Sequence, residues 1–162
     1  MRRLVSALSL VLASATAYAQ DRQNYFDGPL LPITAGVADC PEPEPPGMTE
    51  IELKEQAHVR AQHGGSCYRA GRCRLPNSYL YDKEIIPRLK IYLTQDDRYA
   101  NTTIWALGER RLVTLMGCVQ SQQQAQEIER SVMLVDDVMG VINLLMTSPH
   151  DTPKYQTRAP KQ

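Results

Sequence analysis

The chain has no excess of charge of either sign, because 18 lysines and arginines are matched by 18 aspartates and glutamates. A protein that captures nucleic acid by bulk electrostatics needs a concentrated basic face, and this composition does not supply one. Beyond the N-terminal region the chain also lacks an apolar run of about 20 residues, the length that a membrane-spanning helix requires. We therefore expect neither a nucleic-acid partner nor a transmembrane segment in the processed chain.

Motifs of common catalytic sites are missing as well. The sequence contains no G-x-S-x-G nucleophile elbow, no phosphate-binding loop, and neither C-x-x-C nor C-x-x-C-H. The acidic pairs Asp96–Asp97 and Asp136–Asp137 are interpreted as solvated residues at the boundaries of a helix and a strand. The sequence therefore predicts a protein that is not an enzyme, with no catalytic residue and no cofactor.

The N-terminus has the layout of a secretory signal peptide. Arg2 and Arg3 precede an apolar run over residues 4–12, and Ala17-Tyr18-Ala19 forms a cleavage motif. Cleavage after Ala19 leaves 16 basic and 18 acidic residues, a formal charge of −2. These features predict an exported protein.

The remaining sequence divides by composition into four parts. We expect a Pro-rich arm or linker over 20–48, a helix and a Cys-containing loop over 49–77, an α+β unit over 78–146, and a disordered tail over 147–162. The helix opens on a capping-box pattern from Thr49 to Glu52. A second capping pattern, Ser121 with Gln124, marks the start of a later helix.

The part over 78–146 has the periodicity of a small αββαβ unit. An apolar-periodic helix is expected over about 81–94, with Pro87 inside it, and two alternating runs between Ile104 and Val119 predict a β-hairpin. We expect a three-stranded mixed sheet with two helices on one face, preceded by the Pro-rich extension and its helix.

The second alternating run reads V-x-L-x-G-x-V, filled by Val113, Leu115, Gly117 and Val119. With this motif the segment 82–146 resembles the BON domain, a small module of bacterial envelope proteins. Further matches are Asp82, Ile85, Leu89 and Leu93 in the first helix, Ala125, Ile128 and Val132 in the second, and Val135 to Val138 before the last strand. The chain departs from the family at Arg111 and Leu134, where glycine is usual.

The resemblance implies a non-enzymatic module of the periplasm that associates with phospholipid or the outer membrane. It suggests Arg110, Arg111 and Arg130 as lipid contacts, although each is also interpretable as an ordinary surface residue. The alternative is a structural or interaction subunit of a periplasmic protein assembly. The Pro-rich arm and the tail suit that alternative, because extended segments can wrap a neighbour.

Alternation along the strands leaves the sheet with a second apolar face. Trp105, Leu107, Leu112, Met116 and Cys118 are expected to point away from the two helices. The N-terminal extension, a partner protein or lipid could cover this face, and we favour the extension because large exposed apolar patches are uncommon on monomers.

Four cysteines in an exported chain predict two disulfides with three alternative pairings. We favour Cys67 with Cys73, which closes a small loop, and Cys40 with Cys118, which ties the arm to the sheet. The competing interpretation is a metal site of His63, Cys67 and Cys73, with His58 as an optional ligand. We favour no metal, because zinc ligands usually have tighter paired spacings and an oxidising compartment competes for the thiols.

Overall fold

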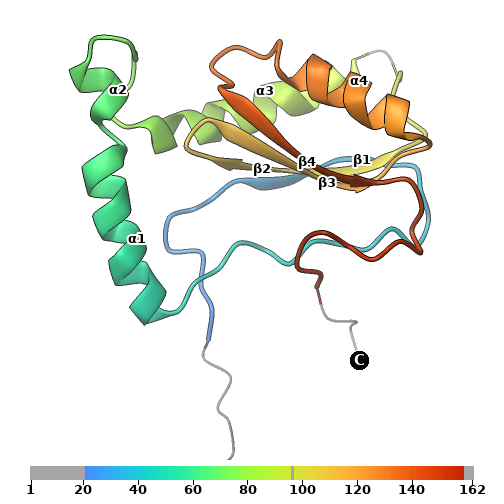
Figure 1. Ribbon diagram of the computed structural model, residues 1–162, viewed down its shortest axis with the longest axis horizontal. Coiled ribbons are helices and arrows are strands. Elements are labelled where there is room, and N and C mark those ends of the chain that lie inside the picture. Colours follow the sequence, from blue (N-terminus) through green and yellow to red (C-terminus); the bar gives the residue numbers. More distant parts are fainter. Residues whose placement is uncertain (1–20, 96, 159–162) are drawn as a thin grey trace, which may run out of the picture.

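The computed structural model describes residues 21–95 and 97–158, which form an α+β fold (Figure 1). In chain order the elements are β1 (Leu30–Ala35), α1 (Glu50–His63), α2 (Ser66–Arg69), the 3-10 turn η1 (Ser78–Tyr81), α3 (Asp82–Thr94), β2 (Thr103–Glu109), β3 (Leu112–Cys118), α4 (Gln122–Val132) and β4 (Gly140–Met146). The predicted class is confirmed. The expected signal peptide, residues 1–19, lies outside the described residues.

The sheet has four strands in the order β1-β2-β3-β4, so the prediction of three strands is wrong. The first two pairings are antiparallel and the pairing of β3 with β4 is parallel, which makes the sheet mixed as expected. The additional strand, β1, comes from the segment 20–48 that we expected to be an arm. Pro32 lies within β1 opposite Trp105. An edge strand tolerates proline because the backbone on its outer side forms no hydrogen bonds with a neighbouring strand. The same proline makes the segment difficult to recognise as a strand from the sequence, because proline normally argues against a strand.

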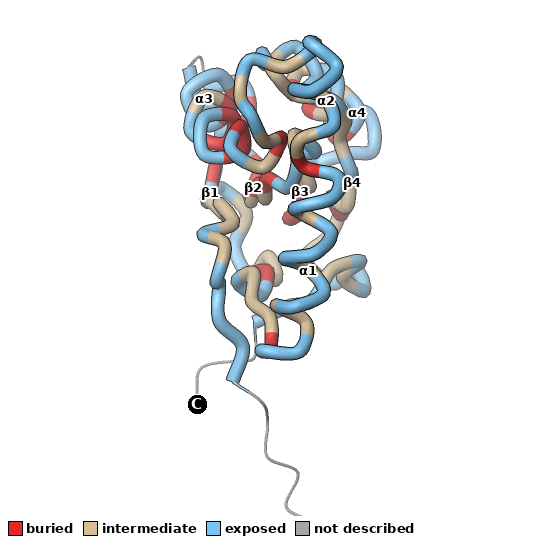
Figure 2. Tube along the Cα trace, turned by 90° about the vertical axis from the view of Figure 1, so that its left-hand side faces the viewer, coloured by how far each residue is buried: buried red, intermediate tan, exposed pale blue. Residues whose placement is uncertain are grey.

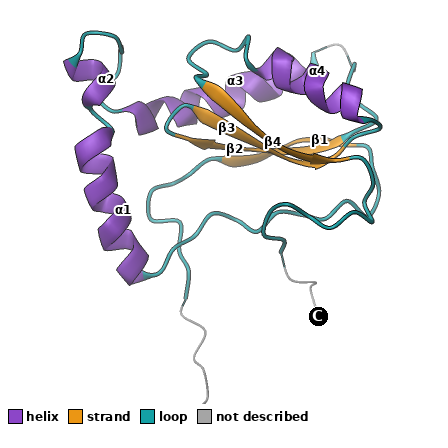
Figure 3. Cartoon of the chain, viewed as in Figure 1, coloured by secondary structure: helices purple, strands orange, loops and turns teal. Residues whose placement is uncertain are grey.

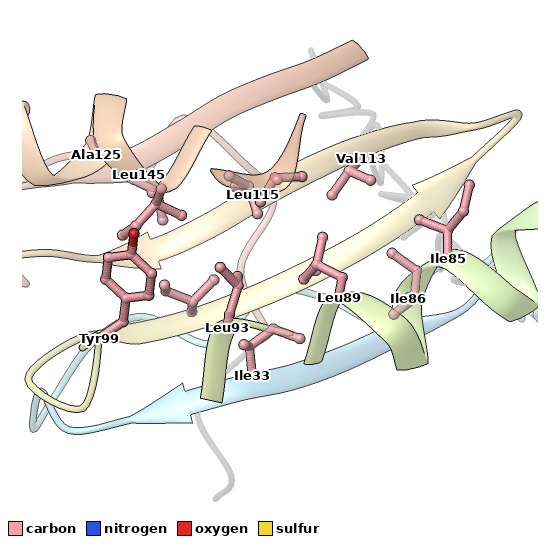
Figure 4. Packing of buried hydrophobic residues seen from close by; sticks show 14 of the residues in the cluster. Ile33, Ile85, Ile86, Leu89, Leu93, Tyr99, Val113, Leu115, Ala125 and Leu145 are labelled. Atoms are coloured by element: carbon pink, nitrogen blue, oxygen red, sulfur yellow. The ribbon is translucent and has the colours of Figure 1, made fainter. Parts of the chain in front are cut away.

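Helices α3 and α4 cover one face of this sheet (Figures 1 and 3). Helix α3 passes through Pro87 without ending there. The packed side chains are no more than 1% exposed (Figure 4): Ile85, Ile86, Leu89 and Leu93 from α3, Ala125, Ile128 and Val132 from α4, and Val113 and Leu115 from β3. The two predicted helical stripes therefore meet the predicted strand face.

The opposite face is partly covered by the segment 36–48. Cys40 of this segment forms a disulfide with Cys118 of β3, and Cys118 is only 1% exposed. Self-coverage by the extension, which we favoured, thus accounts for this part of the face. Towards the hairpin end, Leu112 and Ile142 remain 40% and 45% exposed.

The C-terminal segment 147–158 lies beside the same arm (Figure 1). The amide of Glu44 donates to the carbonyl of Gln156 at 2.8 Å, and the amide of Arg158 donates to the carbonyl of Glu42 at 2.9 Å. We expected a disordered tail from residue 147 onward. The structure instead pairs residues 156–158 with the arm, a non-local contact that composition does not reveal.

Helix α1 stands away from the sheet and has no buried residue (Figure 2). Its capping box forms as predicted, with the Thr49 side chain accepting from the Glu52 amide and the Glu52 carboxylate accepting from the Thr49 amide. One of its attachments is Arg60, whose guanidinium lies 4.1 Å from the Phe26 ring centroid and 3.9 Å from that of Tyr79. Stacked rings on a guanidinium thus attach a helix that has almost no apolar face.

Candidate functional site

The turn between β2 and β3 is held by a buried carboxylate at the start of α3. Asp82 is 3% exposed, and its two oxygens accept from the amides of Arg110 and Arg111, each at 2.7 Å. Burial raises the pKa of Asp82 above its usual value, although the hydrogen bonds from the Arg111 and Arg110 amides act in the opposite direction. Both turn residues have positive φ, 56° and 69°, a conformation that favours glycine or asparagine.

Arg111, one of the three suggested lipid contacts, points into the molecule. Its side chain is 14% exposed, its Nε donates to the carbonyl of Asp137 at 2.8 Å, and its guanidinium lies 4.7 Å from the Tyr81 ring centroid. Its Nη1 lies 3.1 Å from the Sγ of Cys73. These internal contacts leave little of the side chain for a surface ligand.

Asp137 also forms ion pairs with two further arginines at the same end of the sheet. Its carboxylate lies 3.1 Å from Arg88 and 3.5 Å from Arg74, and Arg74 also pairs with Glu84 at 2.7 Å. The hydrogen bond from Arg74 lowers the pKa of the exposed Glu84 carboxylate. Each exposed pair contributes little stability by itself, so we interpret the group as a positional anchor for the loop before β4.

Arg130, another suggested contact, lies on a surface hollow at the C-terminal end of α4. We define the α4-end patch as Arg98, Tyr99, Arg130, Met133 and Leu134, which line a hollow of about 590 Å³. Met133 and Leu134 are 46% and 74% exposed. The hydroxyls of Tyr99 and Ser131 lie 3.0 Å apart and join the patch to the core.

Arg110, the third suggested contact, lines a different hollow, of about 370 Å³, together with Cys67, Leu112 and Met139. The structure therefore does not bring Arg110, Arg111 and Arg130 together in one site. Sequence reasoning missed the exposed Met133 and Leu134. The sequence did contain an indication of these two residues. They are apolar and follow directly after Val132, the last buried position of the α4 stripe, so packing of that stripe does not account for them.

The favoured disulfides are both present, since Cys40 is bonded to Cys118 and Cys67 to Cys73. The metal interpretation would require free thiolates at Cys67 and Cys73, which are instead bonded to each other. Within residues 21–95 and 97–158, no three His, Cys, Asp or Glu side chains are grouped so that they could hold a metal ion. In the same ranges, no helix has both the length and the apolar content to cross a membrane.

Comparison with known proteins adds no relative: no family model matches the chain, and no curated protein and no solved structure is significantly similar to it.

Proposed function

We propose that this protein is an exported, non-enzymatic binding module of the bacterial periplasm that associates with phospholipid through the α4-end patch. The observation that carries the proposal is the exposure of Leu134, 74%, and Met133, 46%, beside Arg130. Exposed apolar side chains gain free energy by entering the acyl boundary of a bilayer, and neighbouring arginines meet anionic headgroups. The two disulfides are compatible with export.

The charges of the patch decide which interaction should dominate. Arg98 and Arg130 share the hollow with Glu127 and Glu129, so the formal charges of its lining cancel. Glu129 is partly engaged by the amide nitrogen of Asn143, at 3.0 Å. We therefore expect apolar insertion of Leu134 to contribute more than electrostatic attraction, with only a modest preference for anionic lipid.

Vesicle co-sedimentation of the processed chain, residues 20–162, tests this proposal. Vesicles of phosphatidylglycerol and of phosphatidylcholine should both sediment the protein, the first more strongly. Leu134→Glu should weaken binding about tenfold or more, because it removes the burial of one large apolar side chain. Arg130→Gln should have a smaller effect that disappears in high salt.

Ile51→Glu is the matched control, because Ile51 is 65% exposed on α1, away from the patch. This variant should sediment like the unmodified chain. Equal binding by Leu134→Glu and the unmodified chain, or no binding by either, would refute the proposal.

The second candidate is a structural or interaction subunit of a periplasmic assembly. The observation that favours it is α1, a 14-residue helix with no buried residue that stands away from the sheet. Two results together would favour this candidate over the first. A defined partner should bind the processed chain and bind the Ile51→Glu variant more weakly, and the processed chain should show no detectable binding to vesicles.

A further inference from the structure

The two disulfides lie in contrasting surroundings. Cys40–Cys118 spans 78 residues and joins the arm to β3, where Cys118 is 1% exposed. Cys67–Cys73 spans only 6 residues and joins α2 to the loop that follows it. Cys67 of this second bond lines the open hollow that it shares with Arg72, Arg110, Leu112 and Met139. A reductant can therefore approach Cys67 without unfolding the protein.

A fixed arginine lies against the other sulfur of the same bond. Nη1 of Arg111 is 3.1 Å from the Sγ of Cys73 and 3.9 Å from the Sγ of Cys67. The guanidinium cannot easily move away, because Nε is bonded to the Asp137 carbonyl and the group lies over the Tyr81 ring. The shorter distance singles out Cys73 as the sulfur that the cation stabilises.

The arginine interacts differently with the oxidised and the reduced states. A disulfide sulfur is neutral and only a weak hydrogen-bond acceptor, so it gains little from a guanidinium. A thiolate at Cys73 would instead accept a charge-assisted hydrogen bond. A positive group beside a cysteine stabilises its thiolate, and a stabilised reduced form makes a disulfide a stronger oxidant.

We propose that Cys67–Cys73 is a thiol–disulfide exchange site, in which Cys67 is attacked and Cys73 leaves as a thiolate stabilised by Arg111. A thiolate of a dithiol reductant forms a bond to the Cys67 sulfur, and the electron pair of the broken Cys67–Cys73 bond moves to Cys73. The second thiol of the reductant, as its thiolate, then attacks the reductant sulfur of the mixed disulfide, and Cys67 leaves and takes a proton from water. The reductant becomes a disulfide, and two electrons have moved to the protein.

This site is independent of the α4-end patch and of lipid. Reduction separates Cys67 in α2 from Cys73 in the loop before η1. The buried cluster under α3 and α4 and the Cys40–Cys118 disulfide are held by other contacts and stay in place. The proposal therefore predicts selective reduction without unfolding.

The test is the rate at which dithiothreitol reduces each disulfide of the processed chain, followed by alkylation and peptide mass spectrometry. Cys67–Cys73 should be reduced while Cys40–Cys118 remains intact. Arg111→Met should slow reduction of Cys67–Cys73 about tenfold, the effect of losing one hydrogen bond to a charged group. A purely structural role of Arg111 predicts the opposite, since a looser loop would be reduced faster.

Arg88→Met is the matched control, because Arg88 binds the same Asp137 carboxylate, at 3.1 Å, but is not among the groups that contact the sulfurs. Its reduction rate should stay close to that of the unmodified chain. If Arg111→Met does not fold, the pH dependence of alkylation in the reduced, unmodified chain decides the question. Cys73 should then reach half-maximal alkylation at a lower pH than Cys67. Faster reduction in Arg111→Met, equal reduction of the two disulfides, or indistinguishable alkylation profiles would overturn the proposal.

Discussion

Asp82 stabilises the hairpin turn at a cost. Its buried carboxylate accepts two 2.7 Å hydrogen bonds from the turn amides, while burial of the charge raises its pKa. Without Asp82, the backbone amides of Arg110 and Arg111 would have no hydrogen-bond acceptor from this side chain, at a position that is partly shielded from water. A single side chain on α3 thus makes a turn of two arginines compatible with the sheet.

We expect the stability difference between the unmodified chain and Asp82→Asn to depend on pH. The substitution should cost about 2 kcal/mol, because one turn amide loses its acceptor. A carboxyl whose folded pKa is raised binds its proton more tightly in the folded state. Its contribution to the free energy of unfolding is therefore largest below the unfolded pKa and falls as the pH rises through the window up to the folded pKa. The difference in unfolding free energy between the unmodified chain and Asp82→Asn should therefore narrow as the pH rises from the unfolded to the folded pKa of Asp82, and it should stay constant at higher pH.

Urea denaturation of both proteins at a series of pH values measures this difference. Glu84→Gln is the control, because Glu84 is exposed and its pKa is lowered, so its contribution should grow with rising pH instead. If the stability difference between the unmodified chain and Asp82→Asn widens with rising pH instead, the two amide hydrogen bonds lower the pKa of Asp82 by more than burial raises it.

The β2–β3 hairpin uses arginine twice where glycine or asparagine is usual. Arg110 has φ 56° and Arg111 has φ 69°, yet only Arg111 makes a dense set of side-chain contacts. A side chain in the left-handed region costs about 1 to 2 kcal/mol unless other interactions offset the cost. The two positions of one turn therefore have different reasons for being arginine.

Glycine substitution at these two positions should shift stability in opposite directions. Arg110→Gly should raise the free energy of unfolding by about 0.5 kcal/mol, because relief of the left-handed strain exceeds the entropy cost of glycine. Arg111→Gly should lower it by about 2 kcal/mol, because the bond to the Asp137 carbonyl and the contact with Tyr81 are lost. Thermal unfolding of both variants checks this, and a lower melting temperature for Arg110→Gly would contradict it.

At the scale of the whole molecule, the arm, the sheet and the C-terminal segment are held together by contacts far apart in the sequence. Cys40 is bonded to Cys118, the hydroxyl of Tyr155 donates to the Pro41 carbonyl at 2.7 Å, and Arg158 pairs with Glu42 at 2.8 Å. The helix-covered face has its own core. The second face is closed by covalent, polar and apolar contacts together, since Pro43 of the arm is fully buried and Met116 and Met146 are 6% and 3% exposed.

Removal of the two disulfides should have unequal effects. In the chain-entropy model, closing the 78-residue separation contributes about 4.5 kcal/mol and closing the 6-residue separation about 2 kcal/mol. The double serine variant at Cys40 and Cys118 should therefore lower the free energy of unfolding by about 2 kcal/mol more than the variant at Cys67 and Cys73. Urea denaturation measures both, and equal losses would show that the arm contributes no long-range constraint.

Local features were predictable because their causes lie within a few residues. The capping box at Thr49 forms as predicted, and Ser121 caps α4 by accepting from the Gln124 amide. The stripe of Ile128 and Val132 is buried as its helical spacing indicates. The two disulfide pairings were favoured because each pair suited the expected fold. Of the candidate site residues, Arg110 and Arg130 lie on separate hollows.

By itself, the sequence determined the α+β class, the helical and strand periodicity over 82–146 and the cysteines available for bonding, because these follow from short-range spacing and composition. Only the tertiary structure decided that Leu30 pairs with Leu107 in a fourth strand, that Thr157 lies against Pro43, and that Arg111 points at a disulfide. The physical reason is that each of these contacts joins groups distant along the chain. Their free energy depends on what the folded backbone brings within a few ångströms, and no local pattern encodes that.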